Sequence, residues 1–256
     1  MRFYEFGDKK LPVILLLPGT CCHWNANFGE VIPLLVKKFC VICASYDGFD
    51  ETESTVFPDM LTETAKIEAY VKENFGGHIC AAYGCSLGGS FVGLLVERGS
   101  VLIDHAILGS SDLDQGGGLS AKLKGKIMVG VLAGILQTGK PPGWLQKRLN
   151  KKPPEDKEYY EKFIRLFCGG SMAFVKKQSV YNQFYSDLVT PIGDDISSHG
   201  TTVHCFYAEK MGEKYLDRYR KHFANPDIRR HNLQHEELLM RYPEKWAEEV
   251  LHCCAL

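Results

Sequence analysis

The chain has 256 residues, of which 45% are hydrophobic, so it can bury one full core and we expect a single domain. Thirty Lys and Arg residues stand against 31 Asp and Glu residues, which gives a formal net charge of −1. This balance provides no overall positive field for a polyanion, and a nucleic-acid partner is therefore not expected.

The first half of the chain alternates short apolar runs with helix-like segments. Strands are expected at residues 2–6, 12–17, 40–45, 78–83 and 102–108. The first strand is expected to pair beside the second through a turn at Gly7-Asp8. Helices are expected at 30–38, about 58–75 and 87–98. Strands and helices alternating at this spacing predict a mostly parallel sheet that is covered on both faces.

The alternation stops between residues 115 and 200. This stretch holds a glycine run at 116–118, a helix-like segment at 126–136 and a Pro-Pro-Gly sequence at 141–143, with no strand pattern. A helical insertion explains it better than a second domain, because strands then follow at 202–208 and 228–233, and helices at 214–223 and 236–251. We therefore expect an α/β fold of about seven strands.

The cysteines and the first residues of the chain indicate the cellular compartment and the absence of a metal site. Ten cysteines are too sparse for a disulfide scaffold, and the pairs Cys21-Cys22 and Cys253-Cys254 lack C-x-x-C spacing. Neither a metal nor another cofactor is expected. No basic segment precedes a long apolar core at the start, and no apolar run approaches ~20 residues. We expect a cytoplasmic protein without stable membrane insertion.

The strongest local signal is the sequence GCSLGG at residues 84–89, between an expected strand and an expected helix. In such an elbow a serine occupies a strained turn, and glycines let the backbone and the helix approach closely. Its hydroxyl then projects above the sheet edge at the positive end of a helix. Ser86 is therefore the predicted nucleophile. The alternative is a glycine-rich turn whose serine only caps the helix.

A serine hydroxyl is a poor nucleophile unless a base takes its proton, so a histidine is required later in the chain. His235 follows the last expected strand and opens the last helix, where a loop could bring its ring over Ser86. His235 is the predicted base. His231, inside the expected strand, is the main alternative, and either histidine could instead be structural.

The carboxylate that orients the histidine should follow the strand at 202–208. Glu209 is the first carboxylate there and is the predicted acid. Asp112, at the end of the strand at 102–108, could reach the same histidine from the other side. Glu213 is a third candidate for the acid, although the sequence favours a solvated carboxylate in the first turn of a helix at this position.

Acyl transfer also needs donors for the developing oxyanion. The amide of Leu87, directly after the nucleophile, would supply one donor, and the amide of Thr20 in the turn LPGTCC the other. The alternative for the LPGTCC segment is an ordinary turn at the end of a strand, with no role in catalysis. Cys21 and Cys22 are weaker candidates for a nucleophile, because no base stands near them in a recognisable arrangement.

The LPGT turn after a buried strand, the GCSLGG elbow and the late LQHEELL sequence together resemble the α/β-hydrolase superfamily, which includes esterases, lipases and thioesterases. The resemblance covers nearly the whole chain and implies the order nucleophile, acid, histidine. Here that order is carried by Ser86, Glu209 and His235, with Thr20 and Leu87 as oxyanion donors.

The resemblance further implies that residues 115–200 form a helical cap over an acyl pocket. Two positions depart from the common pattern of the superfamily. Pro18-Gly19 stands where His-Gly is common, and Met211 stands where the pattern Gly-x-x-Asp after the penultimate strand would place the aspartate. The first departure keeps the amide donor and removes a side chain.

We therefore expect a serine hydrolase that cleaves a small-molecule ester with an acyl or hydrophobic group, through an acyl-enzyme on Ser86. The alternatives are a ligand-binding protein on the same fold, or a thioesterase, amidase or carbon-carbon hydrolase with the same triad. The sequence leaves the acyl chain length and the oligomeric state open.

Overall fold

The computed structural model describes residues 1–256 except 112, 114–117, 168–171 and 198–199. Its centre is a seven-stranded sheet in the order β1-β3-β2-β4-β5-β6-β7. Neighbouring strands are parallel except for β1 and β3, which are antiparallel. The α/β class and the expected number of strands are thus confirmed. The strands are β1 (Arg2–Phe6), β2 (Val13–Leu17), β3 (Cys40–Ser45), β4 (His78–Gly84), β5 (Leu102–Leu108), β6 (Thr202–Ala208) and β7 (Asp227–His231).

One expected strand pairing is wrong. β1 pairs with β3, with Arg2 opposite Ser45 and Phe6 opposite Val41, and it does not pair with β2. The reason is that β2 is a central strand with a parallel neighbour on each side, β3 and β4. Both of its edges are therefore already hydrogen-bonded, and β1 takes the free edge of β3.

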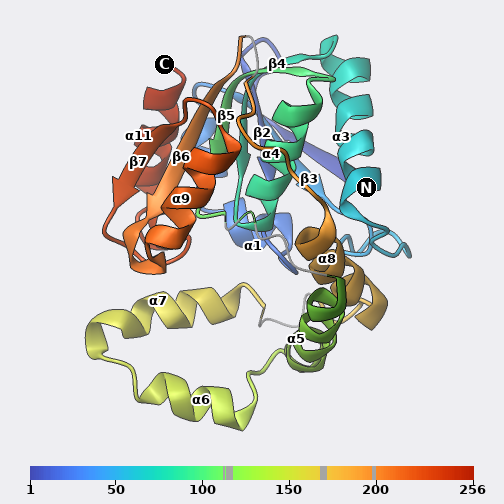
Figure 1. The fold of residues 1–256 in the computed structure, drawn as a ribbon, viewed down its shortest axis with the longest axis vertical. Helices are drawn as coiled ribbons and strands as arrows, with labels where there is room; N and C mark the ends of the chain where they lie inside the picture. Colours follow the sequence, from blue (N-terminus) through green and yellow to red (C-terminus); the bar gives the residue numbers. More distant parts are fainter. Residues whose placement is uncertain (112, 114–117, 168–171, 198–199) are drawn as a thin grey trace.

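Helices cover both faces of this sheet (Figure 1). The helices in the described part of the chain are α1 (Trp24–Phe28), α2 (Ile32–Leu35), α3 (Met60–Phe75), α4 (Leu87–Arg98), α5 (Gly118–Thr138), α6 (Gly143–Asn150), α7 (Pro154–Arg165), α8 (Lys177–Val189), α9 (Glu213–His222), α10 (Glu237–Arg241) and α11 (Pro243–Cys253). Of the helix expected at 30–38, only the part at Ile32–Leu35 forms, as α2. The helix expected at 236–251 is divided in two at Tyr242, because a residue before proline is disfavoured in helical conformation and Pro243 follows.

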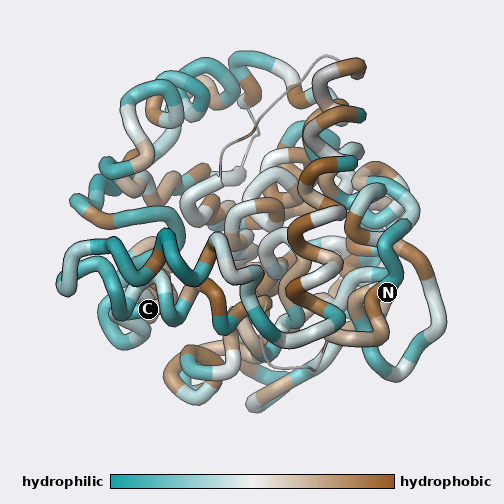
Figure 2. The backbone as a smooth tube through the Cα atoms, turned by 90° about the horizontal axis from the view of Figure 1, so that it is seen from below, coloured by the Kyte–Doolittle hydropathy of each residue, from teal (hydrophilic) through white to brown (hydrophobic). Residues whose placement is uncertain are grey.

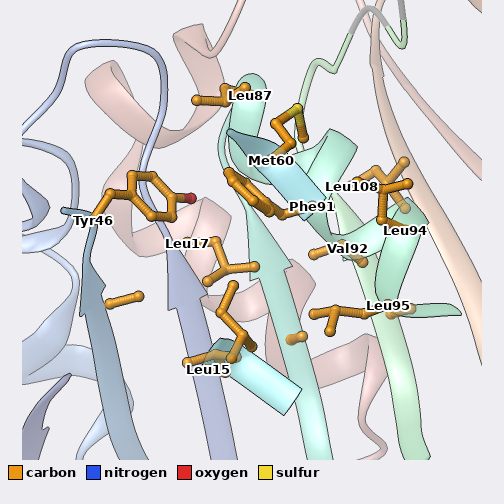
Figure 3. Close-up of a cluster of buried hydrophobic side chains, with 14 of the residues drawn as sticks. Leu15, Leu17, Tyr46, Met60, Leu87, Phe91, Val92, Leu94, Leu95 and Leu108 are labelled. Atoms are coloured by element: carbon orange, nitrogen blue, oxygen red, sulfur yellow. The ribbon is translucent and has the colours of Figure 1, made fainter. Parts of the chain in front are cut away.

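The two faces of the sheet bury two separate hydrophobic cores, as the alternation along β2 illustrates. Leu15 and Leu17 belong to the core beneath α3, α4 and α9, whereas Ile14 and Leu16 belong to the core beneath α1, α2 and α11. Figure 3 shows part of the first core, in which the two leucines lie in one cluster with Phe91 of α4. Both faces of β2 are therefore buried.

The segment between β5 and β6 contains α5, α6, α7 and α8, and no strand in its described part. These four helices lie beyond one end of the sheet (Figure 1). The packing within the segment is led by α5 against α8. The expectation of a helical stretch without strands is confirmed for the described residues.

Candidate active site

Ser86 occupies a strained turn between β4 and α4, with φ 51° and ψ −110°. Positive φ is costly for a residue with a side chain and is found where the surrounding structure enforces it. A Cβ at Gly84 would collide with the Gly88 backbone, and one at Gly88 would collide with the Leu17 carbonyl. The close approach of β4, α4 and β2 therefore requires glycine at both positions and fixes the serine at the end of the sheet.

A cavity of about 300 Å³ opens at this turn. Its polar wall includes Thr20, Ser86 and His235, so the structure brings together the predicted nucleophile, the predicted base and one predicted oxyanion donor. Its apolar wall comes from the segment between β5 and β6 and consists of Met128, Leu132, Phe163, Leu166, Phe167, Phe184 and Leu188. A mainly apolar pocket with a few converging polar groups is the usual form of a small-molecule site.

His235 lies in the loop between β7 and α10. Burial lowers the pKa of His235, and the nearby charge of Glu236 and a hydrogen bond with the Ser110 backbone only partly oppose this effect. The imidazole is therefore neutral at neutral pH and able to accept a proton. His231 is the last residue of β7, where its ring lies against Phe206, and it is not among the described residues that line the cavity.

The predicted acid lies elsewhere. Glu209 begins a short 3₁₀ turn after β6, and its carboxylate accepts a hydrogen bond from Arg230 at 3.5 Å. Within the described part of the chain, no hydrogen bond or ion pair joins Glu209 to His235, and Glu209 does not line the cavity. Glu213 is the first residue of α9. The alternative acid, Asp112, lies outside the described residues.

Glu236 is a buried carboxyl beneath the nucleophile that the sequence reasoning missed. Its side chain is only 4% exposed. Oε1 accepts a hydrogen bond from the Ser86 backbone amide at 2.7 Å, and Oε2 accepts one from the Tyr83 hydroxyl at 2.9 Å. Its own amide donates to the Ser110 hydroxyl at 3.2 Å. Glu236 thus connects the loop that carries His235 to the ends of β4 and β5.

The surroundings of Glu236 disfavour the ionised form of its carboxyl group. Burial raises the pKa of the Glu236 carboxyl, while His235 and the hydrogen bonds from Ser86 and Tyr83 lower it by a smaller amount. The backbone of Glu236 also has positive φ, at 54°. The one sequence signal that could have identified this residue is its position directly after His235, because the contact with Ser86 spans 150 residues of chain.

Two backbone amides at this site are the predicted oxyanion donors. Thr20 lines the cavity, and Leu87 is the first residue of α4, directly after the serine. Neither amide has a hydrogen-bond acceptor within the described residues, whereas the neighbouring Gly19 amide donates to Asn27 at 2.9 Å and the Cys21 amide to Gln183 at 2.7 Å. Unpaired N–H groups at a site of developing charge are the requirement for an oxyanion hole.

The thiols near the serine are poor nucleophiles. Burial raises the pKa of Cys22 to about 12, although the Asn27 amide partly opposes this, and burial likewise raises the pKa of Cys21 and Cys85. All three are therefore thiols rather than thiolates at neutral pH. The nine cysteines in the described ranges are free. No group of three or more His, Cys, Asp or Glu residues in those ranges could hold a metal ion.

Comparison with known proteins identifies the fold. No family model matches the chain, and a search of curated proteins finds no relative. Among solved structures, an alpha/beta hydrolase family protein from Desulfitobacterium hafniense is 17% identical with a TM-score of 0.77, over 98% of this chain and 99% of that one. A structure from a study of carboxylesterases of Nitrososphaera gargenis is 12% identical with a TM-score of 0.68, over 99% and 93% of the two chains. The enol-lactonase from Burkholderia xenovorans is 14% identical with a TM-score of 0.68, over 100% and 96%.

Proposed function

Because the chain has the α/β-hydrolase fold, we propose that it is a serine hydrolase that cleaves a carboxylic ester through an acyl-enzyme on Ser86. One observation carries this proposal. Ser86 stands on a strained strand-to-helix turn and shares a single cavity with the neutral His235 and with the Thr20 turn. In acyl transfer a nucleophile, a base and an oxyanion donor meet at one site, and the shared cavity supports these three roles.

The proposed reaction has two halves. In the first, His235 takes the proton of the Ser86 hydroxyl as its oxygen attacks the ester carbonyl, and the amides of Thr20 and Leu87 stabilise the oxyanion. The imidazolium then gives its proton to the departing alcohol, which leaves an acyl-enzyme. In the second half, His235 takes a proton from water as the resulting hydroxide attacks the acyl carbonyl, and the bond between the acyl carbon and the Ser86 oxygen then breaks. The carboxylic acid leaves, and the imidazolium returns its proton to Ser86.

We prefer Asp112 to Glu209 as the orienting acid, which reverses the ranking from the sequence, because the surroundings of Glu209 argue against it. Glu209 is paired with Arg230 and does not line the cavity among the described residues. The hydroxyl of Ser110, two positions before Asp112 in the chain, accepts a hydrogen bond from the amide of Glu236, the residue after His235. The end of β5 is therefore the strand end that contacts the loop carrying the base.

The walls of the cavity favour a small ester with an apolar acyl group. Seven apolar side chains, from α5, α7, α8 and the two residues after α7, line the cavity that holds Ser86. The cavity volume of about 300 Å³ lies at the lower end of the range of ligand sites, roughly 300 to 1,000 Å³. In this proposal the segment at 115–200 is a cap that closes over the acyl group and excludes water.

Labelling with a fluorophosphonate probe tests the nucleophile. The unmodified protein should react covalently, Ser86→Ala should not react, and His235→Ala should react far more slowly. Circular dichroism of both variants controls for folding. Failure of the unmodified protein to react, or equal labelling of folded Ser86→Ala, would exclude the proposed chemistry.

A further inference from the structure

Helices α5 and α6 and the residues around them concentrate positive charge. Residues 118–152 contain eight basic residues and no Asp or Glu, so the rest of the chain holds 22 basic residues against all 31 acidic ones. The near-neutral net charge of the protein therefore conceals a strong separation of charge along the chain. The eight basic residues are Lys122, Lys124, Lys126, Lys140, Lys147, Arg148, Lys151 and Lys152.

The same helices expose large apolar side chains. Leu119, Leu123 and Ile127 of α5 are 87%, 62% and 58% exposed, and Trp144 of α6 is 57% exposed. These are the four most exposed large hydrophobic side chains in the described part of the chain. The spacing of four residues places the three aliphatic side chains on one face of α5. Such a continuous exposed apolar stripe indicates a binding surface.

Both helices lie at the end of the molecule away from the sheet (Figure 1). Figure 2 views the molecule from this end and shows hydrophobic and hydrophilic residues interleaved along its helices. The opposite face of α5 is buried, and its Met128 and Leu132 line the cavity at Ser86. The helix that carries the exposed stripe is therefore also a wall of the candidate active site.

We propose that this surface, formed by residues 118–152, binds the surface of an anionic phospholipid membrane. Leucine, isoleucine and tryptophan side chains enter the boundary between headgroups and acyl chains, while surrounding lysines and arginines bind the anionic headgroups. None of the helices in the described ranges combines the length and hydropathy needed to cross a bilayer. The proposed contact is thus peripheral.

The charges decide between this partner and two others. In a two-fold dimer the same surface of each copy would face the other. Eight positive charges would then lie opposite eight others and repel them. A nucleic acid would match the charge, but three of the four exposed apolar residues are aliphatic and offer no ring on which a base could stack. An anionic lipid surface satisfies both the charge and the aliphatic stripe.

Co-sedimentation with vesicles tests this inference. Ser86→Ala is used so that lipid cleavage plays no part, and the vesicles are phosphatidylcholine with or without phosphatidylglycerol. We expect binding only when phosphatidylglycerol is present, and weaker binding as salt rises. In this background, Lys147→Glu with Arg148→Glu should weaken binding at least about tenfold, and so should Leu123→Ser with Ile127→Ser.

Matched variants control for general effects of charge and exposure. Lys37→Glu with Lys38→Glu changes two exposed lysines before β3, and Leu61→Ser changes an exposed leucine of α3 that is 48% exposed. Both controls should bind like the parent. Equal binding to vesicles without phosphatidylglycerol, or loss of binding in the controls alone, would overturn the proposal.

Two further results would also overturn it. The first is a dimer, seen by sedimentation velocity without lipid, that Leu123→Ser with Ile127→Ser abolishes, because the partner would then be a second copy of the chain. The second is binding to a DNA duplex as tight as binding to anionic vesicles, because the partner would then be a nucleic acid. The inference does not depend on the proposed hydrolase, since vesicle binding and fluorophosphonate labelling can fail separately.

Discussion

Replacing Glu236 by alanine should disrupt the support of the nucleophile. The change removes two hydrogen bonds to a buried carboxylate, one from the Ser86 amide and one from the Tyr83 hydroxyl. Hydrogen bonds to charged groups contribute about 1.5–3 kcal/mol each, which places the gross loss at about 3–6 kcal/mol. Burial raises the pKa of Glu236, so its ionised form is costly to bury and part of this loss is offset. We expect a net decrease of about 2–4 kcal/mol in the free energy of unfolding.

The same substitution should lower catalysis more than binding. Without its acceptor the Ser86 amide can leave the strained turn, and small displacements of a nucleophile reduce rates by factors of about 10 to 100. The turnover number for ester hydrolysis should fall by this factor while KM changes little. Urea denaturation, followed by tryptophan fluorescence, measures the stability, and steady-state ester hydrolysis measures the activity.

Two variants separate positioning from general destabilisation. Glu236→Gln keeps one carbonyl oxygen for the Ser86 amide, so its turnover number should stay within about tenfold of the parent. Glu237→Ala removes a neighbouring carboxylate that is equally buried but hydrogen-bonds Gln234 and Arg241 away from the serine. It should cost stability and leave the turnover number nearly unchanged. An unchanged turnover number in Glu236→Ala, or an equal fall in Glu237→Ala, would refute this role of Glu236.

The acid and the base can be tested by two simpler measurements. Asp112→Asn should lower the turnover number by orders of magnitude and Glu209→Gln by only a few fold, and the opposite ranking would restore Glu209 as the orienting acid. Burial lowers the pKa of His235, so kcat/KM should decline toward acid with a midpoint below the ordinary histidine value of 6.5. The free energy of unfolding should also fall toward acid. A histidine whose pKa is lower in the folded state than in the unfolded state stabilises the fold above the unfolded pKa, and this stabilisation is lost as the pH falls through the folded pKa. A midpoint above 6.5 would contradict the buried, neutral imidazole.

The sequence by itself determined the class of fold, most strand positions and the turn that carries Ser86. The strands at 40–45, 102–108 and 202–208 and the helix at 87–98 have the expected bounds. These signals are local: a parallel strand buried on both faces is a continuous apolar run, and a tight strand-to-helix turn needs glycine.

Only the tertiary structure decided which distant segments meet. It placed β1 on β3, set Glu209 against Arg230, and seated Glu236 beneath Ser86, 150 residues away in the chain. Periodicity and turn residues do not encode such contacts, because they depend on the order of the strands in the sheet and on how the connecting loops lie across their ends. A carboxylate that neighbours a histidine in sequence therefore supports the serine backbone, and that role is visible only once the sheet is assembled.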